Sequence, residues 1–125
     1  MRRVLVLALV LLTVGCHKAQ PPMAHGKPVG EWVEALRDPD ARARKKAVTV
    51  LGNVGAADPA VVPALAGAVR DSDAAVRAGA ALALLKIGPA ARDAEPALAE
   101  AQNDQDPAVR QYAARALERV RGGDR

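Results

Sequence analysis

Few side chains in this sequence could act as nucleophiles. Cys16 is the only cysteine, Ser72 is the only serine, and the two histidines, His17 and His25, stand near the N-terminus. A serine or cysteine nucleophile needs a base held beside it in the fold, usually a histidine. No histidine follows His25, and no Gly-rich phosphate loop follows a predicted strand. We therefore predict no catalytic residues and no cofactor.

Cys16, His17 and His25 are the only residues that could suggest a metal site. The two histidines are eight positions apart in HKAQPPMAHGKP, residues 17–28, which has three prolines and no hydrophobic period. A protein metal site needs three or four ligands in a fixed geometry, so we predict none here. The composition of residues 17–28 is typical of a flexible tether.

The residues before Cys16 indicate its chemistry. The chain opens with Met1-Arg2-Arg3, runs through residues 4–14 with one polar residue, Thr13, and reaches Gly15 just before Cys16. A positive start, an apolar stretch and a small residue at the processing site predict a signal peptide over residues 1–15. The apolar run of 11 residues is shorter than the about 20 that a membrane-spanning helix needs.

The segment Thr13-Val14-Gly15-Cys16 resembles the lipobox of bacterial lipoproteins. Gly15 and Cys16 fit the pattern, whereas Thr13 stands where leucine is commonest. The resemblance implies that Cys16 is lipidated, becomes the first mature residue and attaches the chain to the membrane of the bacterial cell envelope. An ordinary secreted protein with Cys16 at its cut site is the alternative. By the sorting rule of enteric bacteria, His17 in place of aspartate favours the outer membrane over the inner.

The charge of the chain gives little support for nucleic-acid binding. The net charge is +4, but loss of Arg2 and Arg3 with the signal peptide leaves 16 basic against 14 acidic residues, a net charge of +2. Nucleic-acid binding depends on dense positive charge, so we predict no nucleic-acid partner. With one cysteine, no intrachain disulfide can form.

Beyond residue 28 the sequence repeats with a period of 33 residues. The repeated positions include Asp38, Asp71 and Asp104; Asp40, Asp73 and Asp106; Arg44, Arg77 and Arg110; and Leu51, Leu84 and Leu117. A fixed period of this length predicts a stacked array of supersecondary units.

Each unit is predicted to contain two helices and no strand. In the first helix, apolar residues recur at helical spacing: Ala43, Ala47, Val50, Leu51 and Val54. The aspartates Asp40, Asp73 and Asp106 occupy N-cap positions, and Gly55 and Gly88 are suited to a left-handed stop. A half unit at about 30–37, two full units and a last helix at about 107–121 make six helices.

The segment DPDARARKKAVTVLGNVG, residues 38–55, resembles the HEAT repeat in its bacterial form, the type found in phycobilisome lyase subunits. Residues 71–88 and 104–120 agree with it. The resemblance implies an all-α fold, a short right-handed α-solenoid of HEAT-like helical hairpins, in which Arg44, Arg77 and Arg110 bond to neighbouring turns. The related deoxyhypusine hydroxylase holds two irons with His-Glu pairs, and this sequence has none.

The interaction surface is predicted from the placement of charge. By the same resemblance, the first helix of each unit lines the convex side and the second helix lines a concave groove. The second helices carry Glu31, Glu34, Glu95 and Glu100, which we take as a candidate interaction surface. The convex side is basic, with Arg42, Arg44, Lys45 and Lys46. This basic side is either solvated or lies against anionic lipid headgroups.

Together these features predict a lipoprotein that presents a non-catalytic HEAT-repeat scaffold to another protein. The predicted divisions are a signal peptide (1–15), a lipidated cysteine with a flexible tether (16–28), a repeat domain (29–121) and a tail (122–125). Residues 115–118, RALE, are apolar on one face only, unlike LALL at 82–85, which predicts an end cap and a monomer. An enzyme or enzyme-maturation subunit is the alternative function.

Overall fold

The computed structural model describes residues 19–122, most of which form six α-helices. These are α1 (Val29–Ala35), α2 (Ala41–Val54), α3 (Val61–Ala68), α4 (Ala74–Ile87), α5 (Glu95–Ala101) and α6 (Pro107–Val120). Two 3-10 helices, η1 (Gly55–Ala57) and η2 (Gly88–Ala94), follow α2 and α4. The predicted all-α, solenoid-like fold is confirmed. The signal peptide and Cys16 were predicted in residues that lie outside the described part of the chain.

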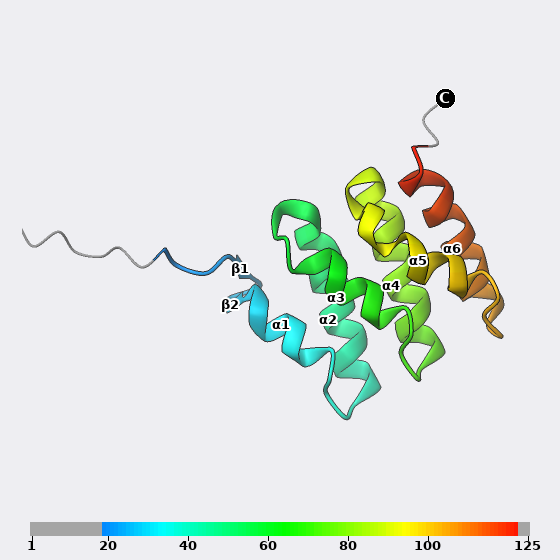
Figure 1. The fold of residues 1–125 in the computed structure, drawn as a ribbon. Helices are drawn as coiled ribbons and strands as arrows, with labels where there is room; N and C mark the ends of the chain where they lie inside the picture. Colours follow the sequence, from blue (N-terminus) through cyan, green and yellow to red (C-terminus); the bar gives the residue numbers. More distant parts are fainter. Residues whose placement is uncertain (1–18, 123–125) are drawn as a thin grey trace, which may run out of the picture.

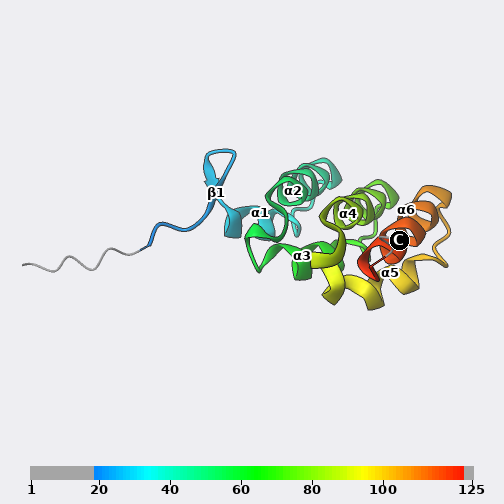
Figure 2. The ribbon, with the colours of Figure 1, turned by 90° about the horizontal axis from the view of Figure 1, so that it is seen from above.

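The helices form two layers (Figures 1 and 2). The long helices α2, α4 and α6 lie side by side in one layer, and the short helices α1, α3 and α5 lie in the other. Helix α4 packs between α2 and α6, and each short helix packs against long helices. Because neighbouring units cover each other's apolar stripes, the hydrophobic core is continuous along the array.

Small side chains are buried in the long helices and let α2 and α4 approach closely. Ala47, Ala80 and Ala113 are fully buried, one in each long helix. A β-carbon placed on Gly52 of α2 would lie 2.9 Å from the β-carbon of Ala83 on α4. The largest fully buried side chains are leucines from both layers: Leu51, Leu65, Leu84 and Leu98. Packing of the long helices therefore depends on residues without bulk.

The predicted aspartate caps begin all three long helices. Asp73 accepts hydrogen bonds from two backbone N–H groups in the first turn of α4, at 2.9 and 3.1 Å. Asp106 does the same in α6, and Asp40 accepts one such bond in α2 at 2.9 Å. Each carboxylate thus satisfies N–H groups that have no partner within the helix.

Glycines end the first two long helices, as predicted, but in a different conformation. Gly55 and Gly88 have φ values of 62° and 74°, with ψ values of −150° and −138°. These ψ values lie outside the left-handed helical region, in a region open almost only to glycine. The chain therefore turns sharply into η1 and η2 at these positions.

The segment predicted to be a flexible tether, residues 17–28, contains a β-hairpin. Strand β1 (Met23–Ala24) pairs with β2 (Lys27–Pro28) in antiparallel register. The two residues between them, His25 and Gly26, have φ values of 49° and 75°. Positive φ at both central residues is the requirement of a type I′ hairpin turn. The prediction of a flexible tether over residues 17–28 was therefore wrong from residue 23 onward.

Hydrogen bonds hold this hairpin on the first helix. The indole Nε1–H of Trp32 donates to the carbonyl oxygen of Ala24 at 2.8 Å, and both residues are buried. The backbone N–H of Val29 donates to the carbonyl oxygen of Pro22 at 2.8 Å. The hairpin therefore belongs to the folded domain, and its two-residue strands are too short to show a hydrophobic alternation in the sequence.

One stretch of the described residues is long and apolar enough to cross a membrane by length and composition alone. It spans Ala74–Ala101 and so includes α4, η2 and α5. The backbone of Ala91 is not helical, with φ −90° and ψ 22°, and α4 and α5 lie in different layers (Figure 2). We therefore assign this apolar stretch to the core of the solenoid.

Substitution of Gly52 by alanine tests the close packing of α2 against α4. Alanine favours the helix by about 0.5–1 kcal/mol over glycine, but overpacking a rigid contact costs about 1–3 kcal/mol. We expect G52A to lower the free energy of unfolding by about 1 kcal/mol, measured by urea denaturation. Gly67→Ala is the control, because a β-carbon there meets nothing within 4 Å, and it should not destabilise. Equal effects of both variants would contradict the packing described.

Candidate functional site

The repeated arginines join consecutive units in a ladder. Arg44 donates to both carboxylate oxygens of Asp71, through Nε at 2.9 Å and Nη2 at 3.1 Å. Arg77 makes the same two bonds to Asp104, also at 2.9 and 3.1 Å. The Nη1 group of Arg44 donates to the carbonyl oxygen of Asp38 in its own unit at 2.9 Å. Each guanidinium therefore ties the loop of its own unit to the next loop.

Asp71 and Asp104 also organise the loops in which they lie. Each accepts a hydrogen bond at 2.9 Å from the backbone N–H of the cap aspartate two residues later. The four side chains of the ladder pairs are between 11 and 18% exposed. The hydrogen bond from Arg77, helped by the N–H of Asp106, holds the pKa of Asp104 below its usual value, although burial opposes this shift. The same pair raises the pKa of Arg77.

Arg110 makes only the half of this arrangement that lies within its own unit. Its Nη1 group donates to the carbonyl oxygens of Asp104 and Gln105, at 2.8 and 3.0 Å. Within residues 19–122 no carboxylate forms an ion pair with Arg110. The structure therefore places the predicted repeat positions in caps and loop bonds, which hold the array together.

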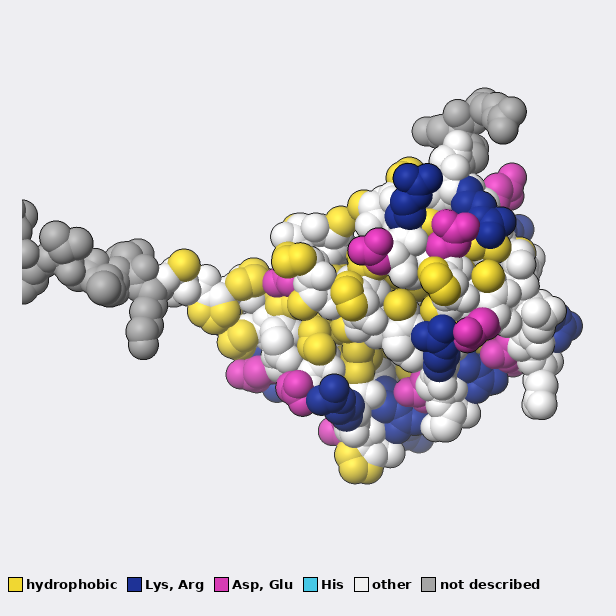
Figure 3. Space-filling model, in the orientation of Figure 1, with side chains coloured by type: hydrophobic (Ala, Val, Ile, Leu, Met, Phe, Trp, Pro, Cys, Tyr) yellow, Lys and Arg dark blue, Asp and Glu magenta, His cyan; other side chains and the backbone are white. Residues whose placement is uncertain are grey.

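The face formed by α1, α3 and α5 carries both apolar and charged side chains. Figure 3 shows hydrophobic side chains across its middle and charged side chains gathered toward its edges. Three of the four glutamates predicted here pair with arginines: Glu34 with Arg37, Glu95 with Arg121 and Glu100 with Arg70. Glu31 is exposed in the first turn of α1. Arginines therefore share this surface with the predicted glutamates.

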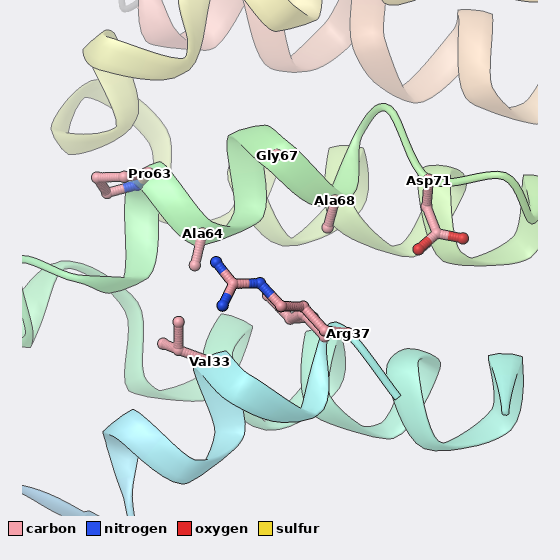
Figure 4. A pocket seen from close by; sticks show the side chains of 8 residues that line it. Val33, Arg37, Pro63, Ala64, Gly67, Ala68 and Asp71 are labelled. Carbon is pink, nitrogen blue, oxygen red and sulfur yellow. The ribbon is translucent and has the colours of Figure 1, made fainter. Parts of the chain in front are cut away.

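A groove lies between α1 and α3 on this face, and the sequence did not predict it. Its volume is about 320 Å³, and its lining is mostly apolar (Figure 4). The lining residues are Val33, Leu36, Arg37, Pro63, Ala64, Gly67, Ala68 and Asp71. Asp71 is already held by Arg44, so Arg37 is the cation that the groove offers.

In the predicted basic cluster on α2, Arg42 is exposed and the other three members lie in three different environments. Arg44 belongs to the ladder, and the Nζ atom of Lys46 lies 5.7 Å from the ring centre of Trp32, where Lys27 also lies at 5.5 Å. Lys45 lines a second groove, on the α2, α4 and α6 face, with a volume of about 550 Å³. Five of the nine residues that line this groove come from α4, and four of these five are alanines or glycine.

Metal-ligating side chains do not gather in the part of the chain that the structure describes. No group of three or more His, Cys, Asp or Glu side chains in residues 19–122 could hold a metal ion. His25 lies in the hairpin turn, and Cys16 and His17 lie outside these residues.

The fold agrees with a comparison to known families. A family model for HEAT repeats matches residues 29–118. The chain belongs to the HEAT-repeat family. The matched region extends from α1 to the last turn of α6, so it includes every ladder pair. HEAT repeats commonly mediate interactions between proteins, which suggests a scaffold module.

Solved structures support the same fold. No curated protein matches this HEAT-repeat chain. The crystal structure of an engineered protein, a structural genomics target, is similar, with 26% sequence identity and a TM-score of 0.64. The match covers 76% of this chain and 46% of that one, so the chain spans less than half the length of the engineered protein. This similarity supports the helical-repeat fold.

The ladder predicts unequal effects for two equivalent arginines. Arg77→Ala removes a two-bond ion pair and leaves the carboxylate of Asp104 without its cation, whereas Arg110→Ala removes only bonds to carbonyl oxygens. Because hydrogen bonds to charged groups contribute more than neutral ones, we expect R77A to lower the free energy of unfolding by about 2 kcal/mol and R110A by under about 1 kcal/mol. Urea denaturation of the full chain measures both. A loss in R110A as large as in R77A would contradict the ladder.

The lowered pKa of Asp104 predicts how the effect of R77A depends on pH. A carboxyl group with a depressed folded-state pKa stabilises the fold above its unfolded-state pKa, about 3.9, and this stabilisation is lost as the pH falls through the folded value. The difference in stability between the unmodified chain and R77A should be constant from about pH 7 to about pH 5 and should shrink below about pH 4. Thermal unfolding across this range provides the measurement. A difference that grows in acid would exclude this role of Asp104.

Proposed function

We propose that the chain is a lipoprotein of the bacterial cell envelope whose HEAT repeats form a non-catalytic scaffold for another protein. One observation carries the anchoring proposal: the only cysteine, Cys16, directly follows a small residue at the end of the apolar run. Membership of the HEAT-repeat family supports the interaction role, because this family commonly binds proteins. The outer membrane is favoured over the inner because His17 follows the cysteine.

The lipid would act by confinement. A cysteine that carries a lipid on sulfur and a further acyl group has more than one chain in the membrane, which gives stable anchoring. Since the hairpin begins at residue 23 and is held through Pro22, the tether is reduced to residues 17–21. Five residues span at most about 18 Å when extended. The scaffold would therefore stay close to the membrane, with its hairpin end nearest to it.

The proposed role requires no bond to be made or broken by this chain. The domain offers apolar and charged side chains on the α1, α3 and α5 face, and a monomer would leave this face open to a partner. The alternative function, an enzyme or enzyme-maturation subunit, predicts a bound cofactor or metal. Stoichiometric metal in the purified full chain, measured by elemental mass spectrometry, would contradict the proposal.

Replacement of the cysteine tests the anchor. In bacterial cells fed a labelled fatty acid, we expect the unmodified chain to incorporate the label and Cys16→Ser to lose it, because the serine hydroxyl cannot take the lipid. Helical signal should remain in C16S, since the described domain begins after this residue. Mass spectrometry should show that the mature unmodified chain begins at an acylated Cys16.

Thr13→Leu is the matched control for this test. It brings position 13 to the residue that is commonest in the lipobox and should keep both labelling and processing. Equal labelling of C16S and the unmodified chain, or a mature chain that begins elsewhere, would overturn the proposed anchor.

A further inference from the structure

The space between α1 and α3 differs from the space between α3 and α5 in the residue at one repeated position. Between α3 and α5, Nε of Arg70 donates to Oε2 of Glu100 at 2.9 Å. One unit earlier, between α1 and α3, the equivalent arginine is Arg37, but the position equivalent to Glu100 is Gly67. The groove between α1 and α3 therefore lies where the next unit has a glutamate side chain paired with its arginine.

Arg37 is held only weakly in the described structure. Its Nη1 group lies 3.4 Å from Oε2 of Glu34, three residues earlier in the last turn of α1, and the two side chains are 80 and 72% exposed. Exposed ion pairs of this kind contribute little to stability and are screened by salt. Figure 4 shows the guanidinium of Arg37 extending from the turn after α1 across the groove toward Ala64 on α3. Arg37 can therefore exchange Glu34 for another carboxylate at little cost.

The groove has room for such a carboxylate. A β-carbon placed on Gly67 meets nothing within 4 Å. The one carboxylate in the lining, Asp71, is already neutralised by its two bonds to Arg44. Apolar side chains such as Val33 and Pro63 form much of the remaining wall. Charge and shape together fit an acidic group attached to an apolar one.

We propose that the groove between α1 and α3 binds an aspartate or glutamate side chain of a partner protein. Arg37 receives the carboxylate as Arg70 receives that of Glu100, and an aliphatic neighbour of the acidic residue lies on the apolar wall. The occupant is a peptide segment and not a free carboxylate, because an exposed ion pair alone is weak and needs these apolar contacts. This inference rests on the proposed protein-binding function and names the chemistry that it recognises.

A displayed library of random peptides, selected on the immobilised full chain, tests this site. We expect enriched peptides to carry glutamate or aspartate beside leucine, isoleucine or valine. Their affinity should fall about tenfold for Arg37→Gln, which removes the charge, and for Gly67→Glu, which supplies the missing carboxylate within the chain. Arg70→Gln is the matched control one unit along, and it should leave the affinity unchanged. If G67E does not fold, R37Q decides alone.

Several results would overturn the groove site. They are the enrichment of peptides without an acidic residue, full affinity for R37Q, equal competition by free glutamate, or no enrichment. Peptides that bind R37Q and R70Q as well as the unmodified chain would remove this groove but leave the protein-binding function standing. Failure of the protein-binding function itself would be seen in a separate experiment, cross-linking in cells, which would then join no other protein to the full chain.

Discussion

The close approach of three long helices over small side chains is the constraint on which the structure depends. Aromatic residues make up only 2% of the chain, Ala47, Ala80 and Ala113 are fully buried in the long helices, and Gly52 of α2 lies against Ala83 of α4. Such contacts bury little area each, so no helix pair suffices alone and every unit relies on the next. The ladder of Arg44 with Asp71, and its repeat one unit later, fixes how far each unit is shifted against its neighbour.

The sequence predicts the structural features that recur with the 33-residue period. Helix positions, aspartate caps and the arginine positions all recur every 33 residues, so chance agreement was easy to exclude. The hairpin was not predictable, because its two-residue strands show no period and its anchor, the Trp32 bond to a backbone oxygen, has no sequence pattern. The pairing of Glu100 with Arg70 was not predictable either, because Arg70 lies in the turn after α3 and Glu100 lies in α5, one unit further along the chain.

This chain differs from an array of identical repeats at the positions where the residue in one unit differs from its equivalent in the next. The side chains at the repeated positions cap helices, join loops or pack in the core, which leaves them little freedom to recognise a partner. Gly67 departs from the pattern set by Glu100 and opens a groove beside an arginine whose partner is weak. The sequence held a signal for this site in the comparison of one unit with the next, but only the structure shows that the two positions face each other.

Site-specific photo-cross-linking in living cells would test most directly that a partner occupies the α1, α3 and α5 face. A photo-reactive amino acid would replace Ala64, in the groove, or Thr49, which is exposed on α2 in the other layer. We expect one main cross-linked protein from position 64, lost when Arg37 is changed to glutamine, and none from position 49. The same cross-linked proteins from both positions, or none from position 64, would contradict the binding of a partner at this face.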